Sequence, residues 1–162
     1  MTIRRAIAVA VVAASVLLLP VPARADITGF IGTMIQPSTQ PLVGVAVGGS
    51  ILIVGFEFEY AKASEDTLAL KPSLATGTGN VLVQTPIGRV QFYGTAGAGV
   101  YHETLGLVSN TKTTVNVGGG VKIGLAGPLR LRLDYRVMTL NGSLRASGTT
   151  LQRFYAGINL KF

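Results

Sequence analysis

The sequence predicts an all-β fold, an eight-stranded antiparallel transmembrane β-barrel with the strands arranged as an up-and-down meander. Three observations favour this class. Charged residues make up only 13% of the 162 residues and hydrophobic residues make up 48%, which leaves too few charges for an ordinary water-covered surface. After Ala25 no apolar run is long enough for a transmembrane helix. Polar and apolar side chains instead alternate along several segments, as in strands with one lipid-facing side.

The N-terminal segment Met1–Ala25 is predicted to be a helical secretory signal peptide. The basic pair Arg4–Arg5 precedes Ala6–Leu19, a continuous run of small and apolar residues with one serine, and Ala23–Ala25 forms an A-x-A cleavage pattern. The apolar run is shorter than the ~18–20 residues that a membrane-spanning helix needs. We therefore expect cleavage at that pattern and a single barrel domain formed by Asp26–Phe162.

Glycine and proline punctuate the remaining chain at short intervals, which favours many strands over helices. Most segments between these residues exceed the ~9–11 residues that a tilted strand needs to cross a bilayer. We expect the strands at Ile27–Gln36, Val43–Leu52, Val54–Ala63, Ser73–Thr85, Arg89–Thr104, Thr113–Leu125, Leu129–Leu140 and Leu151–Phe162.

The predicted connections alternate in length. Outer-membrane barrels have longer external loops and short periplasmic turns, so the alternation supports this arrangement of strands. The segment around Leu52 carries no turn-forming residue, and a single long strand across Ile51–Val54 is the alternative there. Longer polar connections are expected at Gln36–Leu42, Ser64–Pro72, Gly106–Lys112 and Asn141–Thr150, and short ones near Leu52–Ile53 and at Pro86–Gly88 and Ala126–Pro128.

Charged residues recur on one side of several predicted strands. In Leu129–Val137 the apolar residues would face outward and the charged residues inward, and Val54–Tyr60 repeats the pattern with aromatic residues opposite two glutamates. A soluble exterior would normally carry Lys and Glu on every strand, so we expect the apolar sides to face lipid. The residues predicted to line the lumen as a charge network are Glu57, Glu59, Lys122, Arg130, Arg132, Asp134 and Arg136, with Lys161 as a further candidate.

An eight-stranded barrel is just wide enough for side chains to fill its interior. Unpaired charges there would be costly, so acids and bases are expected to pair with one another. We therefore predict a network that plugs the barrel and prevents a diffusive pore. The alternative is that these charges lie in water-filled ends and have no special role.

Several function classes find no support in the sequence. Without cysteine, disulfides and cysteine-based metal sites are excluded, and we predict no cofactor, metal site or catalytic residue. The glycine clusters Gly94–Gly99 and Gly118–Gly120 continue into strand-like sequence, whereas a phosphate-binding loop needs a following helix. They are expected to permit tight curvature and to leave room for large inward side chains such as Tyr93 and Tyr101. The small net charge of the exported part, with no basic stripe, does not favour nucleic acid.

The end of the chain supplies an assembly motif. Tyr155, Gly157, Leu160 and Phe162 fall on the defined positions of the C-terminal signal that the barrel-assembly machinery reads in bacterial outer-membrane barrels. Alternation places Leu160 and Phe162 on the apolar side of the last strand, where an aromatic residue can lie in the interfacial girdle.

The exported part as a whole resembles the OmpA/OmpX-like family of small outer-membrane β-barrel proteins. The resemblance rests on the A-x-A signal and on Gly94–Tyr101, Gly118–Lys122, Leu131–Arg136 and Arg153–Gly157. It implies an eight-stranded barrel in the cell outer membrane, and we expect a monomer. It implies no single activity, because the members serve as structural, adhesive, lipid-modifying or uncharacterised proteins.

We expect a non-enzymatic role in envelope structure or in surface recognition. One alternative is a lipid A-modifying enzyme of the outer membrane, in which a histidine lies two residues before a nucleophilic serine; here His102 is followed by Thr104 instead. Another is a soluble lipocalin-like barrel that binds a ligand in an apolar lumen. Residues expected near the external loops and predicted to contact phosphate-bearing lipopolysaccharide, rather than only solvent, are Lys62, Lys71, Lys112 and Arg145.

Overall fold

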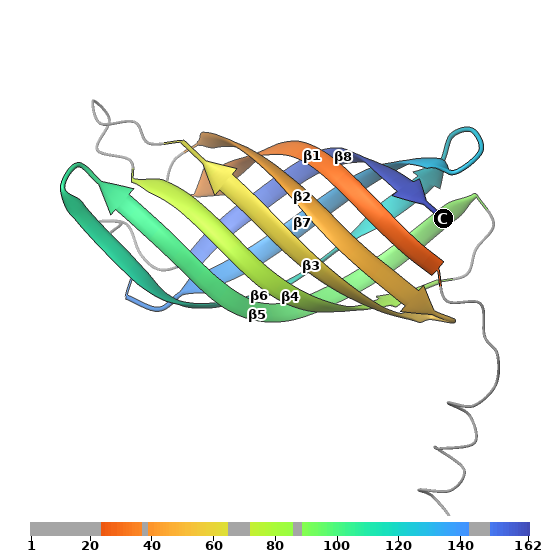
Figure 1. The fold of residues 1–162 in the computed structure, drawn as a ribbon, viewed down its shortest axis with the longest axis horizontal. Helices are drawn as coiled ribbons and strands as arrows, with labels where there is room; N and C mark the ends of the chain where they lie inside the picture. Colours follow the sequence, from red (N-terminus) through yellow and green to blue (C-terminus); the bar gives the residue numbers. More distant parts are fainter. Residues whose placement is uncertain (1–23, 37–38, 65–71, 86–88, 143–149) are drawn as a thin grey trace, which may run out of the picture.

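The computed structural model describes residues 24–36, 39–64, 72–85, 89–142 and 150–162. They form a closed antiparallel barrel of eight strands, in which each strand pairs with the next and β8 pairs with β1 (Figure 1). The predicted fold class is confirmed. The strands are β1 (Arg24–Gln36), β2 (Gln40–Ile51), β3 (Val54–Ala63), β4 (Ser73–Gln84), β5 (Val90–Leu105), β6 (Val108–Gly124), β7 (Leu129–Leu140) and β8 (Thr150–Lys161).

The predicted signal peptide lies outside the described residues, apart from Arg24 and Ala25, which begin β1. The described residues include no helix of the length and apolar character needed to cross a membrane. The backbone of Ala25 exchanges two hydrogen bonds with that of Phe162, so the pairing of β1 with β8 continues to the last residue.

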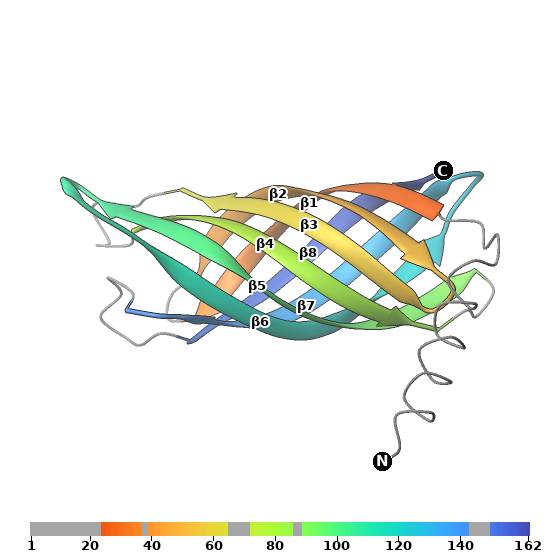
Figure 2. The same ribbon diagram turned by 60° about the horizontal axis from the view of Figure 1, so that its bottom comes forward.

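The two ends of the barrel carry connections of different kinds. The β2–β3 and β6–β7 turns, the start of β1 and the end of β8 lie at one end, which we call the short-turn end (right in Figures 1 and 2). The β1–β2, β3–β4, β5–β6 and β7–β8 connections lie at the other, which we call the long-loop end. The alternation in length that the sequence predicts is present only in part. Residues 64–72 separate β3 from β4 and residues 141–149 separate β7 from β8, but only residues 37–39 separate β1 from β2, where a loop over Gln36–Leu42 is expected.

The first tight turn lies where the sequence gives no turn-forming residue. Ile51 pairs with Val54, so Leu52 and Ile53 alone connect β2 to β3. Leu52 adopts a left-handed φ of 56°, a conformation that costs an L-residue about 1–2 kcal/mol. The predicted strand pair is therefore present, and the alternative of one long strand is wrong.

The β5–β6 connection is shorter than predicted. We expect a loop over Gly106–Lys112 from its polar composition, but β6 begins at Val108 and pairs with β5 up to Leu105. Gly106 has a φ of 58° and permits the tight turn. The resulting hairpin extends beyond its neighbours at the long-loop end (Figure 2). Strand pairing needs only backbone groups, so polar residues outside the hydrocarbon region of the membrane can form it.

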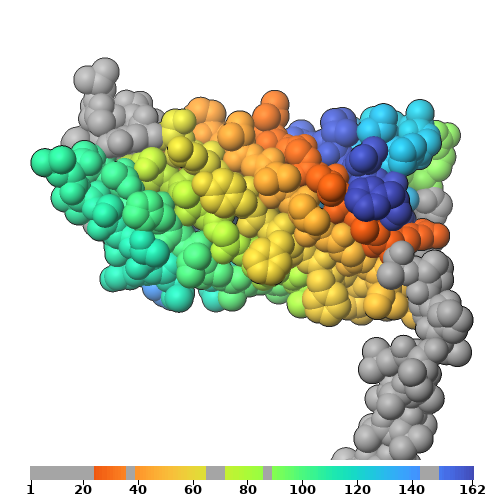
Figure 3. Space-filling model, viewed as in Figure 1, coloured from red at the N-terminus to blue at the C-terminus, as the bar shows by residue number. Residues whose placement is uncertain are grey.

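Burial alternates along the strands as the sequence predicts. On β3 the outward residues Phe56, Phe58 and Tyr60 are exposed, whereas the inward Glu57 and Glu59 are buried. Figure 3 shows the rings of β3 (yellow) standing out from the outer surface. The outer surface is mainly apolar, so the side that the sequence assigns to lipid faces outward. Further large apolar residues exposed on it include Ile31, Val43, Val47, Val83, Phe92, Val100, Val117, Phe154 and Ile158.

Candidate functional site

The middle of the lumen is filled by paired charges from opposite walls. β3 and β7 are separated by three strands in either direction around the barrel, so they face each other across the lumen. β3 supplies two acids, β7 supplies an acid and two arginines, and β8 supplies one arginine. We call these six buried residues the ionic zone: Glu57, Glu59, Arg132, Asp134, Arg136 and Arg153.

Ion pairs join the two walls directly. Arg132 forms a bidentate pair with Glu57, in which Nη2 lies 3.1 Å from Oε1. Arg136 donates from Nη2 to Oε1 of Glu57 at 3.0 Å, and its Nη1 lies 3.2 Å from Oε2 of Glu59. Arg153 on β8 pairs with the same Glu59. Because three acids face three arginines, the ionic zone carries no net formal charge.

Asp134 holds the two arginines of its own strand in place. Its carboxylate lies 3.1 Å from Nη2 of Arg132 and 2.8 Å from Nε of Arg136. Both arginines are completely buried. A buried guanidinium is costly unless its donors are satisfied. The shared carboxylates satisfy most of these donors, whereas Nη1 of Arg136 lies within ion-pair distance of Glu59 without forming a hydrogen bond among the described residues.

Two tyrosine hydroxyls complete the ionic zone. Tyr93 on β5 donates to Asp134 and accepts a bond from Nε of Arg132 at 2.8 Å. Tyr155 on β8 donates to Oε2 of Glu59 at 3.2 Å, and its ring stacks on Phe30 with a centroid distance of 4.0 Å. The guanidinium of Arg132 lies 4.9 Å from the centre of the Tyr93 ring, within the range of a cation–π contact.

Inward glycines make the space that these side chains occupy. A Cβ at Gly118 would lie 2.8 Å from Cγ of Arg136, and one at Gly120 would lie 2.5 Å from the hydroxyl of Tyr93. The glycine cluster therefore accommodates large inward neighbours, as its sequence suggests.

The remaining predicted lumen residues lie nearer the short-turn end and outside the ionic zone. Lys122 is buried and pairs with Asp26 at 2.9 Å. Arg130 is partly exposed and donates to Gln91 at 2.9 Å. Lys161 is partly buried and lies opposite Asp26 in the pairing of β1 with β8.

Sequence reasoning missed two ionic partners. Arg153 and Asp26 were not among the predicted lumen residues, although both form ion pairs there. Arg153 lies two residues before the inward Tyr155, so the period of β8 could have identified its side. Asp26 lies at the edge of the first predicted strand, where alternation gives no signal.

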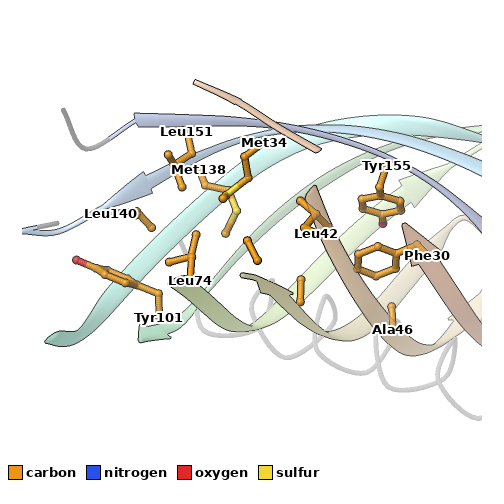
Figure 4. Close-up of a cluster of buried hydrophobic side chains, with 12 residues drawn as sticks. Phe30, Met34, Leu42, Ala46, Leu74, Tyr101, Met138, Leu140, Leu151 and Tyr155 are labelled. Carbon is orange, nitrogen blue, oxygen red and sulfur yellow. The ribbon is translucent and has the colours of Figure 1, made fainter. Parts of the chain in front are cut away.

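The long-loop end of the lumen is filled differently, mainly by apolar side chains (Figure 4), although Gln40 and Glu103 are also buried there. We call this the apolar zone: Met34, Leu42, Leu74, Met138, Leu140 and Leu151, which are all buried. The cavity between its residues measures about 10 Å³, and a second cavity near Asp26 and Lys122 is of the same size. Each is about large enough for one water molecule.

His102 lies on the outward side of β5, near the long-loop end. Its Nε2 is 3.2 Å from Oγ1 of Thr104, and its Nδ1 is 2.6 Å from Oγ1 of Thr111. A histidine and a hydroxyl thus lie within hydrogen-bond reach, but a hydroxyl occupies the place where a hydrolase triad has a carboxylate. The neighbouring Glu103 is buried on the other side of the strand. Among the described residues no group of His, Asp and Glu is arranged to hold a metal ion.

The other predicted contact residues fall in several places. Lys62 on β3 and Lys112 on β6 are exposed near the long-loop end, whereas Lys71 and Arg145 lie outside the described residues. In the predicted assembly motif, Tyr155 and Gly157 point inward, and Leu160 and Phe162 are 41% and 65% exposed on the outer side.

Residues 12–162 match the model of the outer membrane protein beta-barrel domain. The chain belongs to this family. Its structure is similar to the N-terminal β-barrel domain of Pseudomonas aeruginosa OprF, with 14% identity and a TM-score of 0.64 over 86% of this chain and 97% of that one. It is also similar to Neisserial surface protein A (NspA), with 16% identity and a TM-score of 0.65 over 86% of this chain and 96% of that one. The outer membrane enzyme PagL is similar with 11% identity and a TM-score of 0.53 over 83% of this chain and 98% of that one. No curated protein sequence is significantly similar.

Membership places the barrel in the outer membrane. Barrels of this kind have short periplasmic turns and longer external loops, so we expect the short-turn end to face the periplasm and the long-loop end to face outward from the cell. The structural similarities establish a shared fold. Because one of these structures is an enzyme, the family does not decide whether this chain catalyses a reaction.

Proposed function

We propose that this protein is a structural barrel of the outer membrane with a plugged lumen, that its external loops serve surface recognition, and that it is not an enzyme. The observation that carries the proposal is the ionic zone. Ion pairs connect β3 to β7 and β8 across the whole width of the lumen. An ion entering from either end would have to separate buried pairs, which is costly.

The apolar zone supports the same proposal. It closes the lumen on the external side of the ionic zone with leucine and methionine side chains. A hydrated ion gains nothing from such a surface and would lose its water there. Two barriers of different chemistry therefore lie in series.

Conductance across a planar bilayer tests the plug. The mature protein should give no steady open current, after its folding has been verified by a heat-dependent shift on a gel. The positive control opens both zones at once and should conduct: it replaces with Ala the residues Glu57, Arg132, Arg136, Met138 and Leu140. A steady, open current from the wild-type protein would refute the proposal.

The absence of catalysis is tested separately. The pair of His102 and Thr104 lies within reach for base and nucleophile, but a threonine replaces the serine and no described carboxylate orients the imidazole. Lipid A incubated with the folded barrel should keep its full set of acyl chains in a mass spectrum. Loss of an acyl chain that stops with His102→Ala would show an enzyme instead. The soluble-barrel alternative does not fit the apolar outer surface.

The exposed lysines near the long-loop end support contact with the outer leaflet, which is rich in phosphate-bearing lipopolysaccharide. Lys62 and Lys112 lie there, and a lysine near such a surface contributes about 1 kcal/mol. Replacing Lys62, Lys71, Lys112 and Arg145 by Gln should lower the thermal stability more in lipopolysaccharide than in uncharged detergent. Equal losses in both would remove this contact from the proposal.

The end of β8 is suited to recognition during biogenesis. Leu160 and Phe162 lie on the outer side at the short-turn end, where a periplasmic assembly machinery could reach them. We propose that this motif serves the barrel-assembly machinery, and that the mature barrel is a monomer. Phe162→Ala should slow insertion into the outer membrane without changing the folded barrel.

A further inference from the structure

We propose that the outer face of β3, β4 and β5 is a binding site for one phosphate-bearing, acylated lipid of the outer leaflet. An acyl chain would lie beside Phe58 in a hollow of the barrel wall, and its phosphorylated head group would lie at Lys62 and His102. The inference rests on the contact with outer-leaflet lipid proposed above. It assigns that contact to the outer face of β3, β4 and β5, between Phe58 and Lys62.

The hollow lies on the lipid-facing side of the wall. It has a volume of about 280 Å³ and is lined by side chains or backbone of Val47, Phe56, Glu57, Phe58, Gly79, Asn80 and Val81. Phe58 pairs with Gly79, so the largest outward side chain of this region stands directly beside a position with no side chain. Phe58 is 76% exposed, which leaves one face of its ring open to whatever occupies the hollow.

The floor of the hollow continues toward the long-loop end. A Cβ placed at Gly77 or Gly79 would meet no heavy atom within 4 Å. Across the next strand pair, Gly79 lies opposite Ala98 and Gly77 opposite Val100. Phe56, Phe58 and Tyr60 form a ridge along one side of this floor. A smooth floor beside an aromatic ridge has the shape of a track for a single hydrocarbon chain, because packing rather than water release selects contacts in a membrane.

Lys62 supplies a positive charge at the external end of this track, and His102 lies close to it. Lys62, Ala75 and His102 are successive partners across β3, β4 and β5. Neighbouring strands are ~4.8 Å apart, so Lys62 and His102 flank the small Ala75 at about 10 Å from each other. The ring nitrogens of His102 lie 2.6 Å from Oγ1 of Thr111 and 3.2 Å from Oγ1 of Thr104, so two hydroxyls lie beside the ring.

The charge of this face selects an anionic head group. The described acids nearest to it, Glu57, Glu59 and Glu103, all point into the lumen and are buried. Lys62 therefore presents its charge outward without a neighbouring described carboxylate on this face. A phosphorylated, acylated lipid matches both parts of the site. Its phosphate would bind at Lys62, and one acyl chain would lie along the floor of the hollow toward Val81.

Native mass spectrometry of the mature barrel tests the site. The protein is released from mixed micelles that contain either diphosphoryl lipid A or the same lipid A without phosphates, and the bound lipid molecules are counted. Gly79→Leu fills the floor of the hollow. Gly29→Leu is its matched control, because Gly29 also faces outward with no heavy atom within 4 Å of its Cβ, and it lies on β1, three strands and about 14 Å away.

We expect the wild-type protein and Gly29→Leu to retain one lipid A molecule, and Gly79→Leu to weaken retention about fivefold. Lys62→Ala should also weaken it about fivefold, which is what one lysine contributes near an anionic lipid surface, whereas Arg89→Ala at the opposite end should not. The wild-type protein should retain phosphate-free lipid A no better than Lys62→Ala retains diphosphoryl lipid A.

Equal retention by Gly79→Leu and Gly29→Leu would overturn the proposal, as would equal retention of the two lipids or a dimer of barrels that disappears with Gly79→Leu. None of these results bears on the conductance test, so failure of this site is distinguishable from failure of the plugged lumen. A general surface attraction through the loops would also survive them, because it does not require Gly79.

Discussion

The ionic zone and the apolar zone fill the same tube by opposite means. In the ionic zone the arginines depend on acids of the facing wall, as Arg136 depends on Glu57 and Glu59. In the apolar zone Leu140 and Met138 need only the right volume around them. The two zones differ in how specific their contacts are. Ion pairs require particular partners on particular strands, whereas apolar side chains close the lumen through packing with any apolar neighbour.

The largest expected effect comes from removing one charge of the ionic zone. Arg136→Met should destabilise the barrel by about 3–5 kcal/mol, because Glu57, Glu59 and Asp134 would stay buried with too few cations. The free energy of unfolding, measured by urea titration in lipid vesicles, checks this. Arg89→Met is the matched control, since Arg89 is exposed at the short-turn end, and it should change stability by less than about 0.5 kcal/mol. Similar values for the two variants would mean that water, and not protein, satisfies the acids of the lumen.

A truncation in the apolar zone should cost less and leave the lumen closed. Leu140 is completely buried, and Leu140→Ala should lower the free energy of unfolding by about 2–4 kcal/mol through the cavity it leaves. The variant should remain non-conducting, because the ionic zone is intact. Val115→Ala, on the half-exposed outer side of β6, is the control and should cost much less. A larger loss for Leu140→Ala than for Arg136→Met would reverse the ranking of the two zones.

The contrast between the zones also separates what the sequence could predict from what it could not. The side of a strand on which a residue lies is a local property with a period of two, so Glu57, Arg132 and Asp134 could be assigned to the lumen from alternation alone. Which charges meet depends on closure of the barrel and on the register of strands that are not neighbours in sequence. The bond of Arg153 with Glu59 joins residues of β8 and β3, and no local pattern contains it.

The apolar zone escaped prediction for a different reason. The rule that outward residues are apolar and inward residues polar fails where both sides are apolar, as at Leu42 and Val43. Near the long-loop end, apolar side chains fill the lumen. Inward and outward residues are therefore both apolar there, although buried and exposed residues still alternate along the strand. Residues 109–114 of β6 show the reverse case, in which both sides are polar and the strand resembles a loop in sequence.

The smallest expected effect tests whether the lumen is dry beside the ionic zone. Thr95 and Arg136 are the two partners of Gly118 in the sheet. The Thr95 hydroxyl is buried and has no hydrogen-bond partner among the described residues. An unsatisfied buried hydroxyl costs about 1 kcal/mol or more, so Thr95→Val should raise the free energy of unfolding by about 1 kcal/mol in a dry lumen. Thr114→Val is the matched control.

Thr114 is equally buried, but its hydroxyl donates to the carbonyl of Thr139 at 3.0 Å, so its replacement by Val should lower the stability by about 1 kcal/mol. Opposite signs for the two substitutions would separate a paired from an unpaired hydroxyl in one lumen. A loss of stability in both would mean that water reaches Thr95. In that case the polar wall of β5 and β6 would be hydrated, and the apolar zone alone would have to keep the lumen closed.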